Sequence, residues 1–112
     1  MLPDAGDIAW VEFDQTRGTE QFGRRPALVL SDAYYHRYSP RAVVCPISTV
    51  GRRWPFDVAL PAGVRAKGFV LVDQIRTIDR ETRMFRIIER VSGEFLEAVR
   101  IRVAQLIGLA LK

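Results

Sequence analysis

The sequence predicts a small, mainly β domain that ends in one α-helix. Most of the chain is divided into short apolar runs, which are separated by polar turns containing Gly and Pro. From residue 92 onwards, the apolar residues instead follow helical spacing. Several short strands followed by one terminal helix favour a strongly bent antiparallel sheet over alternating βαβ units.

The first half of the chain predicts three strands. Residues 8–13 mix β-forming residues with one charge and are bounded by polar turns. Residues 26–30 form a second apolar run whose first residue is Pro26, a position where proline does not break strand pairing. Residues 31–38 begin with capping residues and predict a short helix or turn. Residues 41–47 then form the third strand.

The second half predicts the remaining strands. Residues 56–60 alternate apolar and polar positions, as in a half-buried strand. Residues 69–73 are apolar until the last, and residues 74–79 continue with alternation. After a charged turn, residues 85–91 complete the set of strands.

The last segment predicts a helix of about five turns. Ser92 is its expected N-cap, and Glu94 and Glu97 oppose the positive end of the helix dipole. Ile101 and Leu109 lie off the main stripe, which indicates either a second contact, such as a subunit interface, or ordinary scatter of exposed apolar residues. The stripe itself consists of Phe95, Leu96, Val99, Val103, Leu106, Ile107 and Ala110.

Length and composition fit one folded domain over residues 1–112. A hydrophobic fraction of 48% and a charged fraction of 27% are ordinary globular usage and argue against disorder. The start of the chain has neither a basic nor an apolar run, and no segment approaches the ~18 apolar residues of a membrane helix. We therefore expect a soluble, cytoplasmic protein with no membrane contact.

The positive charge comes mainly from arginine. The formal net charge is +4, and of the 17 basic residues all but Lys67 and Lys112 are Arg. Arginine binds phosphate bidentately and stacks on bases, so this bias suits a nucleic-acid partner. The alternative is that a GC-rich genome favours Arg codons, and the positions of the arginines therefore carry more weight than their number.

The rare residue types exclude several kinds of site. Cys45 is the sole cysteine and stands in an apolar run, so it predicts a buried thiol without a disulfide or catalytic role. His36 is the sole histidine, which excludes two imidazoles within one chain, and we expect it to pack or lie at the surface. One His and one Cys in separate segments leave no zinc cluster. We expect no metal and no cofactor.

The loop of residues 18–26 carries the strongest chemical signal. Its sequence, Gly-Thr-Glu-Gln-Phe-Gly-Arg-Arg-Pro, sets a carboxylate and two guanidiniums against an apolar strand. Metal-free RNA cleavage needs deprotonation of a 2′-hydroxyl, stabilisation of the phosphorane charge and protonation of the leaving 5′-oxygen. Glu20 is ionised at neutral pH and suits the base. Arg25 suits the phosphate oxygens.

This loop and its flanks resemble the MazF/PemK/Kid toxins, the endoribonucleases of toxin–antitoxin pairs. The matching segments are Gly-Asp-Ile-Ala-Trp-Val at residues 6–11, the loop leading into residues 27–31, and Pro-Ile-Ser-Thr at residues 46–49. The resemblance covers nearly the whole chain. It implies a small SH3-like barrel with a C-terminal helix and assembly as homodimers.

The resemblance also implies a catalytic set of Glu20, Arg25 and Thr49. The Thr49 hydroxyl would bind a phosphate oxygen that Arg25 also contacts. Residues 73–79 look like the family's Asp-Gln segment, in which some members use the Asp for acid/base work. Leu71 departs from the pattern, because some members have a catalytic Arg there. Asp73 is therefore a possible catalytic residue, with capping of a turn as the alternative, and Arg25 has the alternative of a salt bridge.

A second loop has the composition of an RNA contact. Arg52 and Arg53 precede Trp54, and two cations beside a large aromatic ring suit phosphate binding and base stacking. Trp54 plugging the end of the barrel is the alternative. Arg24 neighbours Arg25 on a strand, so only one of the two should face the site. The further candidate RNA-binding residues are Arg17, Gln21, Arg24, Gln74 and Arg76.

The sequence thus predicts a sequence-selective, metal-independent endoribonuclease toxin. The resemblance implies that it leaves a 2′,3′-cyclic phosphate and a 5′-hydroxyl, and that an antitoxin with a flexible acidic tail neutralises it. Single-stranded RNA, most simply mRNA, is the expected substrate. The alternatives are a non-enzymatic toxin on the same barrel that grips a protein such as DNA gyrase, and an RNA-binding module without chemistry.

Overall fold

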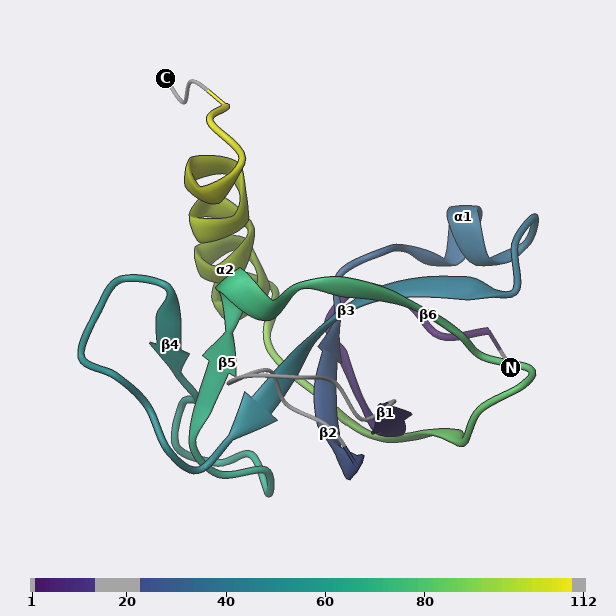
Figure 1. Ribbon diagram of the computed structural model, residues 1–112, viewed down its shortest axis with the longest axis horizontal. Helices are drawn as coiled ribbons and strands as arrows, with labels where there is room; N and C mark the ends of the chain where they lie inside the picture. Colours follow the sequence, from purple (N-terminus) through teal and green to yellow (C-terminus); the bar gives the residue numbers. More distant parts are fainter. Residues whose placement is uncertain (1, 14–22, 110–112) are drawn as a thin grey trace.

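A bent antiparallel sheet with one terminal helix forms the body of the protein (Figure 1). The computed structural model describes residues 2–13 and 23–109. The elements in chain order are β1 Asp7–Phe13, β2 Gly23–Val29, α1 Ala33–His36, β3 Arg41–Ser48, β4 Asp57–Ala59, β5 Phe69–Leu71, the 3₁₀ turn η1 Val72–Gln74, β6 Arg76–Asp79, β7 Phe85–Arg90 and α2 Gly93–Leu106.

The strand order explains how the sheet bends. The strands follow the path β4-β5-β3-β2-β1-β7, and β6 also pairs with β3. The first part of β3 pairs with β6 and its end pairs with β5, with η1 between the two partner strands. The expected mainly β fold with a C-terminal helix is confirmed. Among the described strands, however, the path keeps two ends, so the sheet is bent but is not a closed barrel.

Alternation along β1 places apolar residues on both faces of the sheet. Ile8 belongs to one buried cluster, whereas Ala9, Val11 and Phe13 belong to another. Successive strand residues point to opposite faces, so β1 lies between two cores. Helix α2 covers the first core through Leu96 and Val99.

Strand β2 begins earlier than the sequence indicated. We expected residues 26–30, but β2 starts at Gly23 and contains both Arg24 and Arg25. Pro26 lies inside the strand, opposite Trp10 of β1. The pairing of β2 with β3 starts one residue later, at Ala27. Pro26 therefore has a strand partner in β1 but none in β3. A proline, which lacks a backbone N–H, is tolerated where a strand is not paired on both sides.

The segment expected as one continuous strand over residues 69–79 is interrupted. Asp73 and Gln74 lie in η1, where the chain makes a turn before β6 resumes pairing with β3. The expected strand over residues 56–60 is shorter, because β4 pairs with β5 through three residues. The polar residues at the end of the apolar run thus mark a turn within the sheet.

Helix α2 begins as expected and ends early. The Ser92 hydroxyl accepts a hydrogen bond from the Phe95 N–H at 3.1 Å, which satisfies the first turn. The helix has 14 residues, about four turns, rather than the expected five. It stops because Gly108 adopts a φ of +82° and its N–H and that of Leu109 bond back to Gln105 and Ala104. Within the described residues, no helix is long and apolar enough to cross a membrane.

Candidate active site

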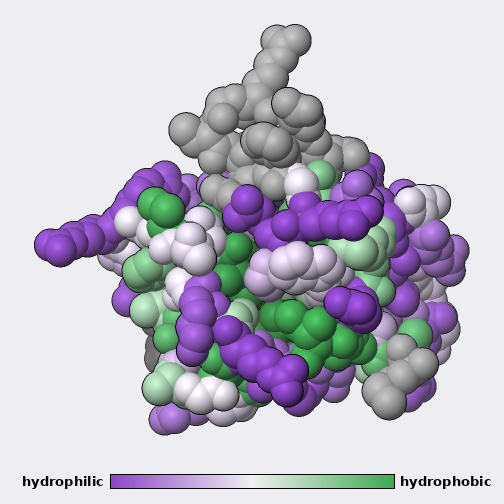
Figure 2. Space-filling view, turned by 90° about the horizontal axis from the view of Figure 1, so that it is seen from below, coloured by the Kyte–Doolittle hydropathy of each residue, from purple (hydrophilic) through white to green (hydrophobic). Residues whose placement is uncertain are grey.

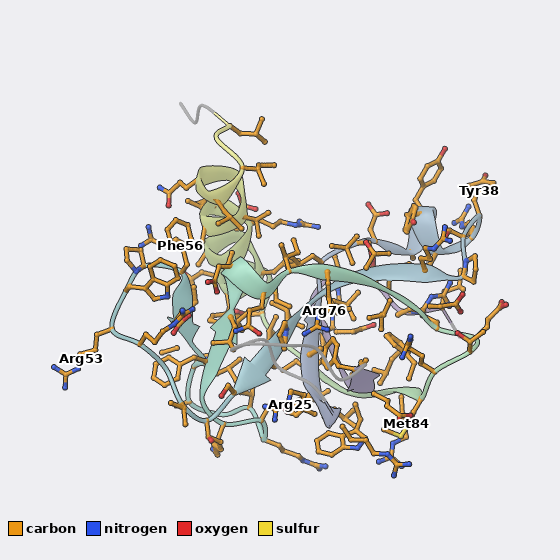
Figure 3. All side chains as sticks on the ribbon, viewed as in Figure 1. Arg25, Tyr38, Arg53, Phe56, Arg76 and Met84 are labelled. Atoms are coloured by element: carbon orange, nitrogen blue, oxygen red, sulfur yellow. The ribbon has the colours of Figure 1, made fainter. Side chains whose placement is uncertain are left out.

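Arg25 and Arg24 stand on opposite faces near the start of β2. Arg25 pairs with Val11 and Arg24 with Glu12 of β1. Arg24 is exposed, whereas Arg25 is half-buried, on the side of the strand that carries Ala27 and Val29. The expectation that these neighbouring guanidiniums face different ways is therefore confirmed by the backbone. Figure 3 shows Arg25 in the lower part of the sheet.

Thr49 follows directly after the last residue of β3. Strands β2 and β3 pair antiparallel, from Ala27 opposite Pro46 to Val29 opposite Val44. Arg25 and Thr49 therefore lie toward the same end of the sheet, where β2 begins and β3 ends. Thr49 is exposed, while Ser48 is buried and its hydroxyl accepts a hydrogen bond from the Val50 N–H at 3.1 Å. The sequence-predicted pair of Arg25 and Thr49 therefore shares one region.

The surface at this end of the sheet is mixed in character. Figure 2 views the molecule from below and shows strongly hydrophilic side chains running beside a hydrophobic area. Surfaces that bind single-stranded nucleic acid combine polar and apolar areas in this way, with cations against phosphates and apolar groups against bases.

Backbone packing holds the end of β3 in place. Gly68 has a φ of +113°, and a Cβ there would overlap the Ser48 carbonyl oxygen and lie 2.8 Å from the Thr49 Cα. Phe69 pairs with Ser48, and a Cβ at Gly51 would lie 2.6 Å from the Phe69 ring. Glycines thus allow the segments on both sides of Thr49 to pack closely.

The loop between β3 and β4 is held by an ionic cluster. The Arg52 guanidinium donates to both carboxylate oxygens of Asp73 at 3.0 Å. It also contacts Asp57 at 3.4 Å, and the Arg52 backbone N–H donates to Asp57 at 2.6 Å. The Trp54 indole N–H donates to Asp57 at 2.9 Å. This loop therefore has a fixed structure.

The charges in this cluster stabilise one another. Burial opposes ionisation of Asp57, yet the bonds from the Arg52 N–H, the Trp54 indole and the Arg52 guanidinium lower the pKa of its carboxyl below the usual value. Hydrogen bonds to Asp57 and then Asp73 raise the pKa of Arg52. Arg52 was expected to bind RNA, but the structure shows its charge already matched by two carboxylates.

Asp57 is the member of this cluster that sequence reasoning missed. Its side chain is 2% exposed. It is the second residue of the alternating run 56–60, and that run predicts a half-buried strand and gives no sign of an ion pair. One weak sign of this ion pair is present in the sequence, which is that Asp57 follows Arg52 by five residues.

The Asp-Gln segment lies beside this loop. Asp73 is half-buried in η1 and bonds Arg52, and Leu71, where some toxins of the resembling family have an Arg, is buried in β5. The Asp73 charge reaches Cys45 on β3. Burial, helped by this charge, raises the pKa of the Cys45 thiol to about 12. Cys45 is thus a buried, protonated residue, as the sequence predicted.

The remaining RNA-binding candidates are spread over the molecule. The Arg76 guanidinium lies 4.5 Å from the centre of the Phe13 ring, which joins β6 to β1. Arg53 is exposed, and in Figure 3 its side chain extends away from the body. Glu20, Arg17 and Gln21 lie outside the described residues.

His36 lies apart from this region and is structural. It is 3% exposed and bonds the Pro3 carbonyl through Nδ1 at 2.8 Å and the Ser31 hydroxyl through Nε2 at 2.7 Å. The carbonyl can only accept, so Nδ1 donates in the bond to Pro3. Across the described ranges, no group of three or more His, Cys, Asp or Glu residues is arranged to hold a metal.

Comparison with known proteins gives a family match over most of the chain. A family model described as PemK-like, MazF-like toxin of type II toxin–antitoxin system matches residues 4–107. The Escherichia coli K12 endoribonuclease toxin MazF is 36% identical over 107 residues, which cover 96% of each chain. The Bacillus subtilis endoribonuclease EndoA is 29% identical over 104 residues, 88% of this chain and 89% of that protein.

Solved structures agree with the sequence match. A crystal structure of MazF from Deinococcus radiodurans superimposes with a TM-score of 0.90 at 37% identity, over 97% of this chain and 99% of that chain. A MazE–MazF complex from the same organism gives a TM-score of 0.85 at 36% identity, over 98% and 99% of the two chains.

Proposed function

The chain belongs to the PemK-like, MazF-like toxin family of type II toxin–antitoxin systems, and we propose that it is a sequence-selective endoribonuclease that cleaves single-stranded RNA without a metal. The relatives described above are named endoribonucleases, which supports this activity. They give no support to the alternative of a toxin that grips DNA gyrase. We propose that the RNA it cleaves is mRNA.

In this proposal Arg25 stabilises the charge that develops on the phosphate. A base, for which Glu20 is the candidate, takes the 2′-hydroxyl proton, and the 2′-oxygen attacks phosphorus. The bond from phosphorus to the 5′-oxygen breaks, and that oxygen takes up a proton. The products are a 2′,3′-cyclic phosphate and a 5′-hydroxyl. Donors fixed at the developing charge are commonly worth ~10²–10³ in rate.

The observation that carries this proposal is the end of the sheet at which β2 begins and β3 ends. Ala27 of β2 pairs with Pro46 of β3, and Arg25 lies two residues before Ala27 while Thr49 lies three residues after Pro46, so both lie toward the same end of this strand pair. A guanidinium and a hydroxyl can then bind two nonbridging oxygens of one phosphate. Arg25 is half-buried, so its interaction with a phosphate would be less screened by water than that of the exposed Arg24.

We also infer the partners of this toxin. A cognate antitoxin with a flexible acidic tail would neutralise it, in keeping with the solved MazE–MazF complexes of Deinococcus radiodurans. The formal charge of +4 favours such a tail. We propose that the toxin acts as a cytoplasmic homodimer, with residues 1–112 forming one domain.

The experiment is incubation of the purified protein with a long single-stranded RNA in excess EDTA, followed by mapping of the cut ends. Arg25→Ala should lose at least ~100-fold in cleavage rate. Arg24→Ala is the matched control, because it removes a neighbouring guanidinium from the opposite face of the same strand. Equal losses in both variants would show that general positive charge matters and would contradict a specific role for Arg25.

The hydroxyl of Thr49 is tested in the same assay. Thr49→Val keeps the shape and removes the hydroxyl, whereas Thr49→Ser keeps the hydroxyl. We expect cleavage to fall with Val and to persist with Ser. Intact RNA after incubation with the folded wild-type protein would overturn the nuclease proposal altogether.

A further inference from the structure

Two adjacent arginines in the loop between β3 and β4 have different surroundings. Arg52 bonds Asp73 through two 3.0 Å contacts and Asp57 through a longer one. Arg53 is exposed and forms no ion pair with any residue that the structure describes. Two carboxylates face the single guanidinium of Arg52, so this cluster presents no net positive charge. Arg53 keeps a cation available to solvent.

The Trp54 ring is contacted by Arg52, Phe56 and Asp57. The Arg52 guanidinium lies 4.6 Å from the centre of the Trp54 ring. The Phe56 ring meets it edge-on at 5.1 Å, and Asp57 accepts its indole N–H. Trp54 nevertheless remains 39% exposed. The ring is therefore fixed in orientation while part of its surface stays open to solvent.

We propose that Arg52 is a positioning residue that fixes Trp54 as a stacking surface for one unpaired base, and that Arg53 supplies the neighbouring phosphate contact. This inference rests on the proposed nuclease function. A fixed aromatic ring binds a base with less loss of side-chain entropy than a mobile one. Stacking on an aromatic side chain is tolerant of base identity and suits single-stranded RNA.

The two roles predict different dependence on salt. A cation that neutralises an RNA phosphate releases counterions, so each such contact contributes about 0.7 to the slope of log K against log salt for single strands. Arg53 should contribute in this way. Arg52 is already neutralised by Asp73 and Asp57, so its removal should weaken binding without changing the slope.

The binding test uses a 2′-O-methyl oligoribonucleotide that copies the mapped cleavage site, because it lacks the 2′-hydroxyl nucleophile. Arg53→Ala should lower the salt slope by about 0.7. Arg52→Ala should weaken binding at every salt concentration with the slope unchanged, and it should add little in a Trp54→Leu background. A slope reduced equally by Arg52→Ala would mean that Arg52 contacts phosphate, which would overturn the proposal.

A second test needs no RNA and so separates this inference from the nuclease proposal. In a Trp10→Phe background, Trp54 is the sole tryptophan, and acrylamide quenching of its fluorescence reports its exposure. Quenching should rise in Arg52→Ala and Asp73→Asn but not in Arg53→Ala. If Arg52→Ala unfolds, Arg52→Lys serves instead: it keeps the charge but loses the guanidinium nitrogens that bond Asp57 and Asp73 together, so its quenching should still exceed that of the wild type. Unchanged quenching in the folded variants would overturn the positioning role even if RNA is bound and cut.

Discussion

The Arg76 guanidinium on β6 lies 4.5 Å from the centre of the Phe13 ring on β1. Phe13 is 3% exposed and belongs to a buried cluster that also contains Ile78 of β6. In the sheet, β3 and β2 lie between β6 and β1. The contact therefore joins two strands that are not hydrogen-bonded to each other. It thus supports the bend of the sheet.

Replacing Arg76 with Met should lower the free energy of unfolding through loss of this contact. Cation–π pairs contribute about 0.5–1 kcal/mol when exposed and about 2 when desolvated. Met keeps an apolar stem over the ring and removes the charge. Urea unfolding of Arg76→Met, Phe13→Leu and the double variant gives the coupling between the two side chains. Additive losses would show that the ring and the guanidinium contribute independently.

Local sequence signals were sufficient for most elements. Ser92 predicted the start of α2, and runs of β-forming and apolar residues between polar turns located β1 and β7 within a residue or two. Two errors came from glycine and proline. Gly108 ended α2 early through its positive φ, and Pro26 was taken as a strand start although β2 already pairs with β1 at Gly23. Backbone conformation decided the first boundary and strand pairing the second.

The site was harder to predict, because its contacts join segments distant in sequence. Residue types identified Arg25 and Thr49, and the antiparallel pairing of β2 with β3 places them toward the same end of the sheet. The same reasoning put Arg52 among the RNA contacts. Its charge could not be known to be matched, because Asp73 lies 21 residues further along the chain and reaches it through the η1 turn. The catalytic roles of Arg25 and Thr49 stay predictions.

Gly68→Ala should destabilise the protein and greatly reduce cleavage. A Cβ at this position overlaps the Ser48 carbonyl, so the end of β3 and Thr49 would have to move. A displacement of ~1 Å can cost about 10²-fold in rate. Gly63→Ala is the matched control, because it has a φ of +98° but nothing within 4 Å of the added atom. That variant should show strain alone, about 1–2 kcal/mol in urea unfolding, with cleavage retained.

The Cys45 thiol should be unreactive in the folded protein. Its pKa is raised to about 12 by burial, so at about pH 8 roughly one thiol in 10⁴ is ionised. A disulfide reagent such as DTNB should react slowly in native buffer and rapidly in urea. Because this is the sole cysteine, the signal has one source. Fast reaction without denaturant would contradict the buried position of Cys45 on β3.

Asp57 should make the stability of the protein sensitive to acid. Its pKa is lowered in the folded state, so its contribution to stability is fully present above the ordinary Asp value of about 3.9 and is lost as pH falls through the lower folded value. Asp4 and Asp79 also have lowered pKa values and act in the same direction. Comparison with Asp57→Asn isolates the effect. In urea unfolding, the wild type should exceed this variant at about pH 7, and the difference should shrink towards about pH 3. A difference that is constant over this range would mean that the Asp57 charge does not stabilise the loop through Arg52 and Trp54.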